Sequence, residues 1–214
     1  MICLDRVLNP KLDMLNDHVF LFLMRLAANG SVHAILGGPP CRTVSACRYA
    51  DDGGPKPVRS EMEPYGLSTL TPQQRSWVED DVVLMFRMKL LYMMAVQNKP
   101  SWCEQVLFAM EQPQDPKEYR SEEDILKHQY MSVWRTAAWR GFQHKYQLTM
   151  TSFEQGAYGH VKPKPTTFGH NIKGFELLHG GKAPREKTLR WHGKTVLFKI
   201  ESLSHPHGRS GRLE

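Results

Sequence analysis

The sequence has few cysteines, no membrane-length apolar run and no leader segment, and each absence argues against a class of protein. Its four cysteines, Cys3, Cys41, Cys47 and Cys103, have no C-x-x-C spacing, so we expect reduced thiols rather than a disulfide-stapled secreted scaffold. The most apolar stretch, HVFLFLMRLAA, is interrupted by Arg25 and is too short to span a bilayer. The first residues, MICLDRVLNP, carry neither a basic leader nor a cleavage site. We therefore predict an intracellular protein, nuclear or cytoplasmic, that is not secreted and has no membrane partner.

Internal repeats, low-complexity tracts and metal-ligand spacing are also absent. The ten histidines are too scattered for a metal site, so no metal is expected. A chain of 214 residues with 41% hydrophobic and 23% charged residues is typical of a single well-packed domain. We predict an α/β domain over residues 1–179, with a long loop at about 50–71 that is rich in Gly, Pro and charge. A basic C-terminal extension follows over residues 180–214.

Positive charge is in excess. The net charge is +6, and the basic residues concentrate in the last third of the chain, at Lys162, Lys164, Lys173, Lys182, Arg185, Lys187, Arg190 and Lys194. This distribution favours a polyanionic partner. The alternative is a solvated face or tail that binds nothing.

Helical and strand-like segments alternate along the chain. Helices are predicted over residues 18–28 (capped by Asn16 or Asp17), 73–97 (started by Thr71-Pro72), after the Ser121–Asp124 capping box, and over 132–146. Strands are predicted over residues 32–36, 105–110 and 146–153, with further candidates at 166–172 and 194–200. Because the strands alternate with helices, we predict an α/β fold with a mostly parallel sheet and flanking helices.

The stretch ILGGPPCRTVSACRY places a cysteine on a stiff elbow at the end of the first strand. Gly37 and Gly38 permit backbone angles that other residues avoid, while Pro39 and Pro40 fix φ and remove two N–H donors. The elbow ends the strand and orients the next side chain, Cys41. We interpret Cys41 as a functional thiol, and the alternative is an inert packed one.

Unusual loops also follow the next two strands. Glu111 comes after the second strand, and Gln155, Tyr158 and Lys164 come after the third. Carboxyl ends of parallel strands share one edge of a sheet, so these side chains should meet Cys41 there. A thiol, a carboxylic acid and a cation in one cleft can act as nucleophile, proton donor and anion stabiliser.

The order of these motifs resembles the cytosine-5 DNA methyltransferases. GGPPC after a buried strand and MEQP after the next are similar to that family's two catalytic loops. The segments GGPPCRTVSACR and QGAYGHVKPKPTTFGHN look most like the divergent methylase-like proteins of phages and retrotransposons. The resemblance covers roughly Asp13 to Asn171. It implies part of a Rossmann-like methyltransferase fold, S-adenosylmethionine as cofactor and DNA as partner.

The resemblance also implies roles for individual residues. Cys41 would attack C6 of a flipped-out cytosine, activated by Arg42, Arg48 and the helix expected after it. Glu111 would protonate or hydrogen-bond N3, and Lys164 would supply the family's cation.

Further contacts are expected with the substrate and the cofactor. Substrate contacts are expected from Pro39, Pro40, Arg42 and Gln155, and cofactor contacts from Asp13 and, second, Asp5.

The family's glycine-rich cofactor loop has no counterpart ahead of Cys41. This leaves a second hypothesis beside the enzyme: an inactive, N-terminally truncated remnant of a mobile element that retains nucleic-acid binding.

Overall fold

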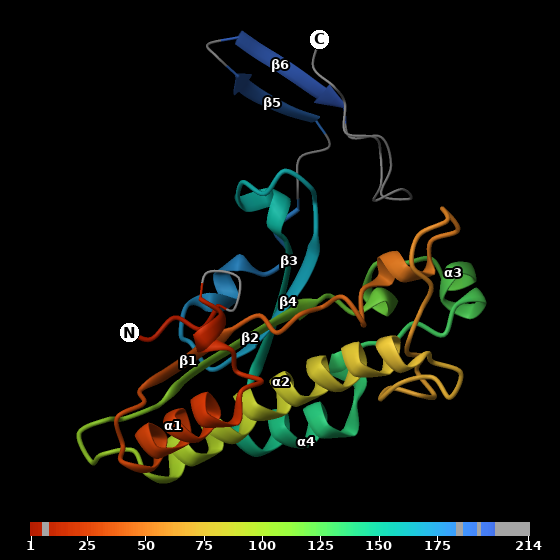
Figure 1. Ribbon diagram of the computed structural model, residues 1–214. Helices are drawn as coiled ribbons and strands as arrows, with labels where there is room; N and C mark the ends of the chain where they lie inside the picture. The colour runs from red at the N-terminus through yellow and green to blue at the C-terminus, as the bar shows by residue number, and fades with distance from the viewer. Residues whose placement is uncertain (6–8, 183–185, 192–193, 200–214) are drawn as a thin grey trace.

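The computed structural model describes residues 1–5, 9–182, 186–191 and 194–199 (Figure 1). The described residues form an α/β fold around a four-stranded sheet with strand order β1-β2-β4-β3. The strands are β1 (Ala34–Gly37), β2 (Leu107–Pro113), β3 (Thr149–Glu154) and β4 (Pro165–His170). A separate two-stranded hairpin consists of β5 (Glu186–Trp191) and β6 (Lys194–Lys199).

The sheet is mixed, which corrects the prediction of a mostly parallel one. Only β1 and β2 pair in parallel, and β4 runs antiparallel to both β2 and β3. The connection between β3 and β4, residues 155–164, holds only the short 3-10 helix Gln155–Tyr158. It is too short for the crossover that a parallel pair requires, so the chain turns back as a hairpin. Because β4 opposes both of its neighbours, β1, β2 and β3 still point in the same direction.

The α-helices begin at the predicted caps in three cases of four; the fourth, predicted over 132–146, begins only at Ala137, because Val133–Arg135 form a 3-10 helix and Thr136 is the cap. The four α-helices are α1 (Asp17–Ala28), α2 (Pro72–Gln97), α3 (Glu122–Lys127) and α4 (Ala137–Tyr146). The side chains of Asn16, Thr71 and Ser121 accept hydrogen bonds from backbone N–H groups in the first turns of α1, α2 and α3. The remaining 3-10 helices are Pro10–Leu12, Ala46–Tyr49, Pro116–Glu118, Val133–Arg135 and Phe175–Leu178.

Helices α1, α2 and α4 pack together on one side of the sheet (Figure 1). Ile35 of β1 and Phe108 and Met110 of β2 point toward these helices and join one buried cluster with Met88 and Phe142. Successive strand residues face opposite sides, so Leu36, Ala109 and Glu111 lie on the other face. That face carries the cleft described below.

The loop at 50–71 contains no helix or strand, as predicted, but it is packed against the domain. Val58 is fully buried, and Arg59 is only 1% exposed and donates from Nη2 to the carbonyl of Val78 in α2 at 3.1 Å. The Glu61 N–H donates to the Gln129 carbonyl at 3.1 Å.

The strand predicted over 194–200 corresponds to β6, and β5 was not predicted. Arg185, Ile200 and the tail with His205 and His207 lie outside the described residues. Within the described residues, none of the helices combines the length and apolarity needed to cross a membrane.

Candidate active site

The GGPPC loop needs its glycines for close approach, not for unusual backbone angles. Neither Gly37 nor Gly38 has a positive φ, which corrects the expectation from the sequence. A Cβ on Gly38 would lie 2.9 Å from Oε2 of Glu111, and one on Gly37 would lie 3.3 Å from Sδ of Met88. The two glycines therefore let β1 approach the helix layer on one face and the Glu111 carboxylate on the other.

Gln112 ties the loop to the neighbouring strand. Its Nε2 donates a 2.6 Å hydrogen bond to the carbonyl of Pro39, and its side chain is fully buried. Gln112 follows Glu111 in β2 and points to the opposite face, so adjacent residues hold the loop and line the cleft. Pro40 is half-buried. Sequence reasoning missed Gln112, although strand alternation next to Glu111 was a signal for it.

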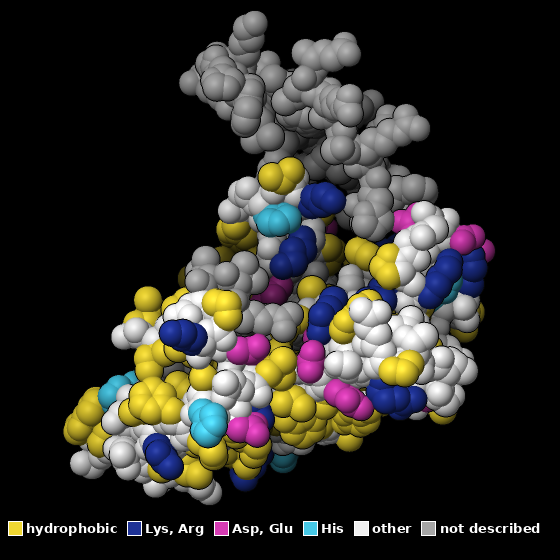
Figure 2. Space-filling view, viewed as in Figure 1, with side chains coloured by type: hydrophobic (Ala, Val, Ile, Leu, Met, Phe, Trp, Pro, Cys, Tyr) yellow, Lys and Arg dark blue, Asp and Glu magenta, His cyan; other side chains and the backbone are white. Residues whose placement is uncertain are grey.

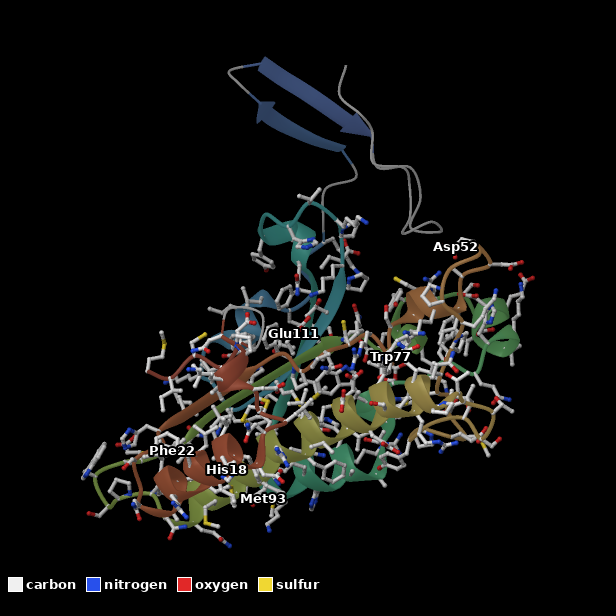
Figure 3. The ribbon with its side chains drawn as sticks, in the orientation of Figure 1. His18, Phe22, Asp52, Trp77, Met93 and Glu111 are labelled. Carbon is white, nitrogen blue, oxygen red and sulfur yellow. The ribbon has the colours of Figure 1, made fainter. Side chains whose placement is uncertain are left out.

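Glu111, Gln155 and Lys164 meet at one edge of the sheet. Oε1 of Glu111 accepts hydrogen bonds from Nε2 of Gln155 and from Nζ of Lys164, both at 3.2 Å. Glu111 lies within β2, which continues to Pro113, and not after the strand as predicted; Figure 3 shows it near the middle of the molecule. The shared direction of β1, β2 and β3 explains this meeting, and Lys164 arrives from the turn that leads into β4.

Lys164 has a left-handed backbone conformation, with φ 43°. For a non-glycine residue this costs about 1–3 kcal/mol and persists only where the surroundings enforce it. The Lys164 carbonyl accepts the Gln155 N–H at 3.2 Å, and the Lys164 side chain, 40% exposed, pairs with Glu111. The strained turn thus holds the Lys164 ammonium group beside the Glu111 carboxylate.

Cys41 is half-buried and interacts electrostatically with both charged groups. Burial raises the pKa of Cys41 most, the negative charge of Glu111 raises it further, and the positive charge of Lys164 lowers it. The pKa of Cys41 is therefore raised overall. This corrects the expectation that its surroundings favour the thiolate in the free protein.

The groups expected to activate Cys41 are engaged elsewhere. The residues directly after Cys41 form a turn and the short 3-10 helix Ala46–Tyr49, not an α-helix with a dipole to stabilise a thiolate. Nε of Arg48 donates to the Arg42 carbonyl, and its Nη1 donates to that of Lys56 at 2.8 Å. Both arginine positions thus serve the structure of the loop.

Arg42 points toward α2 and is not among the residues that line the cleft. Its Nε lies 3.3 Å from Oδ1 of Asp81, its Nη2 lies 3.6 Å from Oδ2 of Asp80, and its Cζ lies 5.7 Å from the ring centroid of Trp77. Asp81 is fully buried and also accepts the Thr43 hydroxyl at 2.6 Å. These contacts fix the loop after Cys41 to α2. No local sequence pattern pointed to Asp81 as their anchor.

An open cleft of about 480 Å³ lies on the sheet face opposite the helices. Its polar lining is Glu111 and Gln155 with the backbone of Gly37 and Gly38, and its apolar wall includes Phe168 and Phe175. The two phenyl rings lie 5.0 Å apart between centroids. A carboxylate and an amide beside aromatic rings suit a flat, polar-edged ring.

The residues expected to hold the cofactor do not line this cleft. Asp13 is half-buried before α1, and its Oδ1 accepts the Leu15 N–H at 2.8 Å, which makes it a local turn residue. Asp5 is exposed near the N-terminus. Among the described residues, no group of three or more His, Cys, Asp or Glu side chains could hold a metal ion.

Comparison with protein-family models and with curated proteins found no match to this chain. The site must therefore be interpreted from its own chemistry.

Proposed function

We propose that this chain is a cytosine-5 methyltransferase-like domain in which Cys41 adds to C6 of a cytosine. One observation carries the proposal: Glu111, Gln155 and Lys164 meet at one sheet edge, and two of them act on the pKa of Cys41. The cleft at Glu111 and Gln155 supplies an aromatic wall for the base; Cys41 itself packs against the buried cluster and is not among the residues that line the cleft. The motif order GGPPC then MEQP supports the same chemistry.

The electrostatic coupling suggests how the thiol is activated. The Glu111 carboxylate raises the pKa of Cys41, so neutralising Glu111 leaves Lys164 as the main charge and favours the thiolate. Transfer of the thiol proton to Glu111 yields both forms that the reaction needs, a thiolate and a carboxylic acid. A bound base bridges the two groups when its N3 takes the proton from Glu111.

The Cys41 sulfur forms a bond to C6, the electron pair of the C5–C6 double bond moves into the ring, and N3 takes the proton of Glu111. The resulting enamine has a nucleophilic C5, which takes a proton from solvent. Loss of the original C5 proton, return of the N3 proton to Glu111 and cleavage of the S–C6 bond regenerate cytosine and the Cys41 thiolate.

The described residues fit S-adenosylmethionine less well than they fit a pyrimidine base. When bound, that cofactor supplies the methyl group in the reaction of the family that the motifs resemble. Glu111 is the only carboxylate among the described residues that line the cleft, and it faces the base. No carboxylate there remains for a ribose diol. We therefore propose pyrimidine addition, without methyl transfer, for this chain.

The test is hydrogen exchange at C5 of cytosine without cofactor. DNA incubated with the protein in D2O should gain deuterium at C5, measured by mass spectrometry of the digested nucleosides. Cys41→Ser should abolish the gain, Glu111→Gln should reduce it severely, and Cys47→Ser should leave it unchanged. A folded wild-type chain that binds DNA yet incorporates no deuterium would overturn the proposal.

That negative result would favour the second candidate, a nucleic-acid-binding remnant without chemistry. The raised pKa of Cys41 and the positions of Asp5 and Asp13 favour it. DNA binding itself should weaken steeply with salt if lysines contact phosphates. The basic and acidic side chains are interspersed on the face in Figure 2, so we expect a local contact rather than a continuous basic face. Lys162→Gln with Lys173→Gln should flatten the salt dependence, and an unchanged slope would exclude these two lysines from the contact.

A further inference from the structure

Lys89 is a buried lysine that the proposed chemistry does not use. It lies on α2, is 8% exposed, and its Nζ sits 4.1 Å from the ring centroid of Phe86. Within the described part of the chain it forms no ion pair with a carboxylate, and burial alone lowers its pKa to about 8. A buried ammonium group without an acidic partner is costly, so its surroundings need an explanation.

Lys89 borders a small cavity of about 20 Å³. The cavity lies between α2, the loop at 50–71 and the segment before α4. Apart from Arg59 and Lys89, its polar lining residues are Tyr65 and Thr136, each with one hydroxyl, and the other walls are apolar, among them Val82 and Met110. This volume holds about one water-sized particle.

Arg59 brings a second cation to the same cavity. Its side chain is 1% exposed, and its Nη1 and Nη2 donate to the carbonyls of Pro64 and Val78 at 3.4 and 3.1 Å. Its buried Nε has no hydrogen-bond partner among the described residues. A buried guanidinium N–H beside a cavity is then an unsatisfied donor, which an acceptor in the cavity would satisfy.

The nearby carboxylates do not neutralise the cavity. Asp81 acts on Arg59 from α2, but its oxygens accept from Arg42 and Thr43, and Asp80 also pairs with Arg42. Among the described residues, no carboxylate lines the cavity. Two cationic side chains thus border a space whose other walls offer few acceptors.

We propose that this cavity binds a small monovalent inorganic anion of halide size between Arg59 and Lys89. A water molecule would find donors there but little to donate to, whereas an anion accepts from both side chains and offsets the cost of burying them. Phosphate and carboxylate ligands are too large for the volume. The site would stabilise the packing of the 50–71 loop on α2, independently of the proposed reaction.

Thermal unfolding of the full chain in sodium chloride and in sodium gluconate, at equal ionic strength, tests the proposal. A ligand that binds only the folded state raises Tm with its concentration. The wild type should therefore gain Tm with chloride over gluconate, and Lys89→Met should lose that gain. Lys145→Met removes a charge from an exposed position on α4 and should keep the gain.

A direct readout completes the test, because chloride can also act on the unfolded chain. Chloride NMR line broadening by the folded wild type should disappear in Lys89→Met and persist in Lys145→Met. Equal Tm values in the two salts, or broadening that survives Lys89→Met, would overturn the proposal and leave a water-filled cavity.

Discussion

Nζ of Lys164 lies 3.2 Å from Oε1 of Glu111, although the two residues are 53 positions apart in the chain. Their opposite charges act in opposite directions on the Cys41 thiol. The reactivity of the Cys41 thiol should therefore report the charges of both Glu111 and Lys164.

Charge removal at the pair should shift the Cys41 pKa in two directions. Glu111→Gln removes a negative charge and should lower the pKa of Cys41, while Lys164→Met removes a positive charge and should raise it. The pH dependence of alkylation measures this, in a Cys3→Ser, Cys47→Ser background because both cysteines are exposed. Shifts of the same sign in both variants would contradict the coupling.

Gly38, the second glycine of the GGPPC loop, should matter for the site more than for stability. In Gly38→Ala the new Cβ would displace the end of the Glu111 side chain, so C5 exchange should fall at least tenfold. The loss in unfolding free energy should stay within about 1 kcal/mol, since a flexible side chain can move.

Gly141→Ala is the matched control. Gly141 lies inside α4, and nothing within 4 Å would meet its Cβ. This change should raise the free energy of unfolding by about 0.5–1 kcal/mol and leave exchange unchanged. If both variants behave alike, the close contact at Gly38 has no role in the site.

The hydrogen bond from Gln112 should position the thiol. Gln112→Leu removes the donor to the Pro39 carbonyl and should cost about 1–3 kcal/mol, because that acceptor loses its partner. Amide hydrogen exchange over residues 37–45 should become faster, and C5 exchange slower.

Gln114→Met tests whether the faster exchange is specific to the loss of the Gln112 hydrogen bond. Gln114 follows the last residue of β2 and, like Gln112, is buried, but its Nε2 donates to Glu118 at 2.9 Å and not to the loop. Its loss should leave the amides of residues 37–45 as slow as in the wild type. Faster exchange there in both variants would assign the effect to β2 as a whole.

His170 should make the fold sensitive to mild acid. It is 1% exposed, its Nε2 lies 2.8 Å from Oγ1 of Thr151, and its Nδ1 accepts the Ile172 N–H at 3.2 Å. Burial lowers its pKa below the ordinary value near 6.5. As pH falls, the His170 side chain therefore takes up a proton in the unfolded chain before it does so in the folded one. The free energy of unfolding should fall as pH drops from about 6.5 toward the lower folded pKa. Urea unfolding between pH 5 and 8 measures this.

A comparison of two histidines checks the assignment. His170→Gln should flatten the pH dependence of unfolding in this range. His18→Gln should not, because His18 is exposed on α1 (Figure 3). A slope that survives His170→Gln would place the responsible proton on another group.

Local chemistry made the helices predictable from the sequence, whereas strand pairing was not. Asn16, Thr71 and Ser121 cap their helices through atoms within three residues, so the signal is contained in short segments. The short connection after β3 already implies that β4 turns back, but the place of β4 between β2 and β3 depends on distant pairing that no local pattern records.

The candidate site was likewise predictable only in part. The meeting of Glu111, Gln155 and Lys164 was predicted from strand ends; it holds although Glu111 lies inside β2, because β1, β2 and β3 share a direction. The raised pKa of Cys41 and the engagement of Arg42 by Asp81 depend on burial and on contacts 39 positions apart. From its sequence neighbours alone, Cys41 was expected to have surroundings that favour the thiolate.

The place of β4 between β2 and β3 also governs when the site can exist during folding. A chain that ends before Pro165 leaves facing edges of β2 and β3 unpaired, and unpaired edges invite association with other chains. Contacts between distant segments form slowly, and the hairpin from β3 into β4 must dock on β2 before Lys164 reaches Glu111. Nascent or C-terminally shortened chains should therefore aggregate before they acquire a reactive centre, and the thiol of a newly made chain should meet its charged neighbours last.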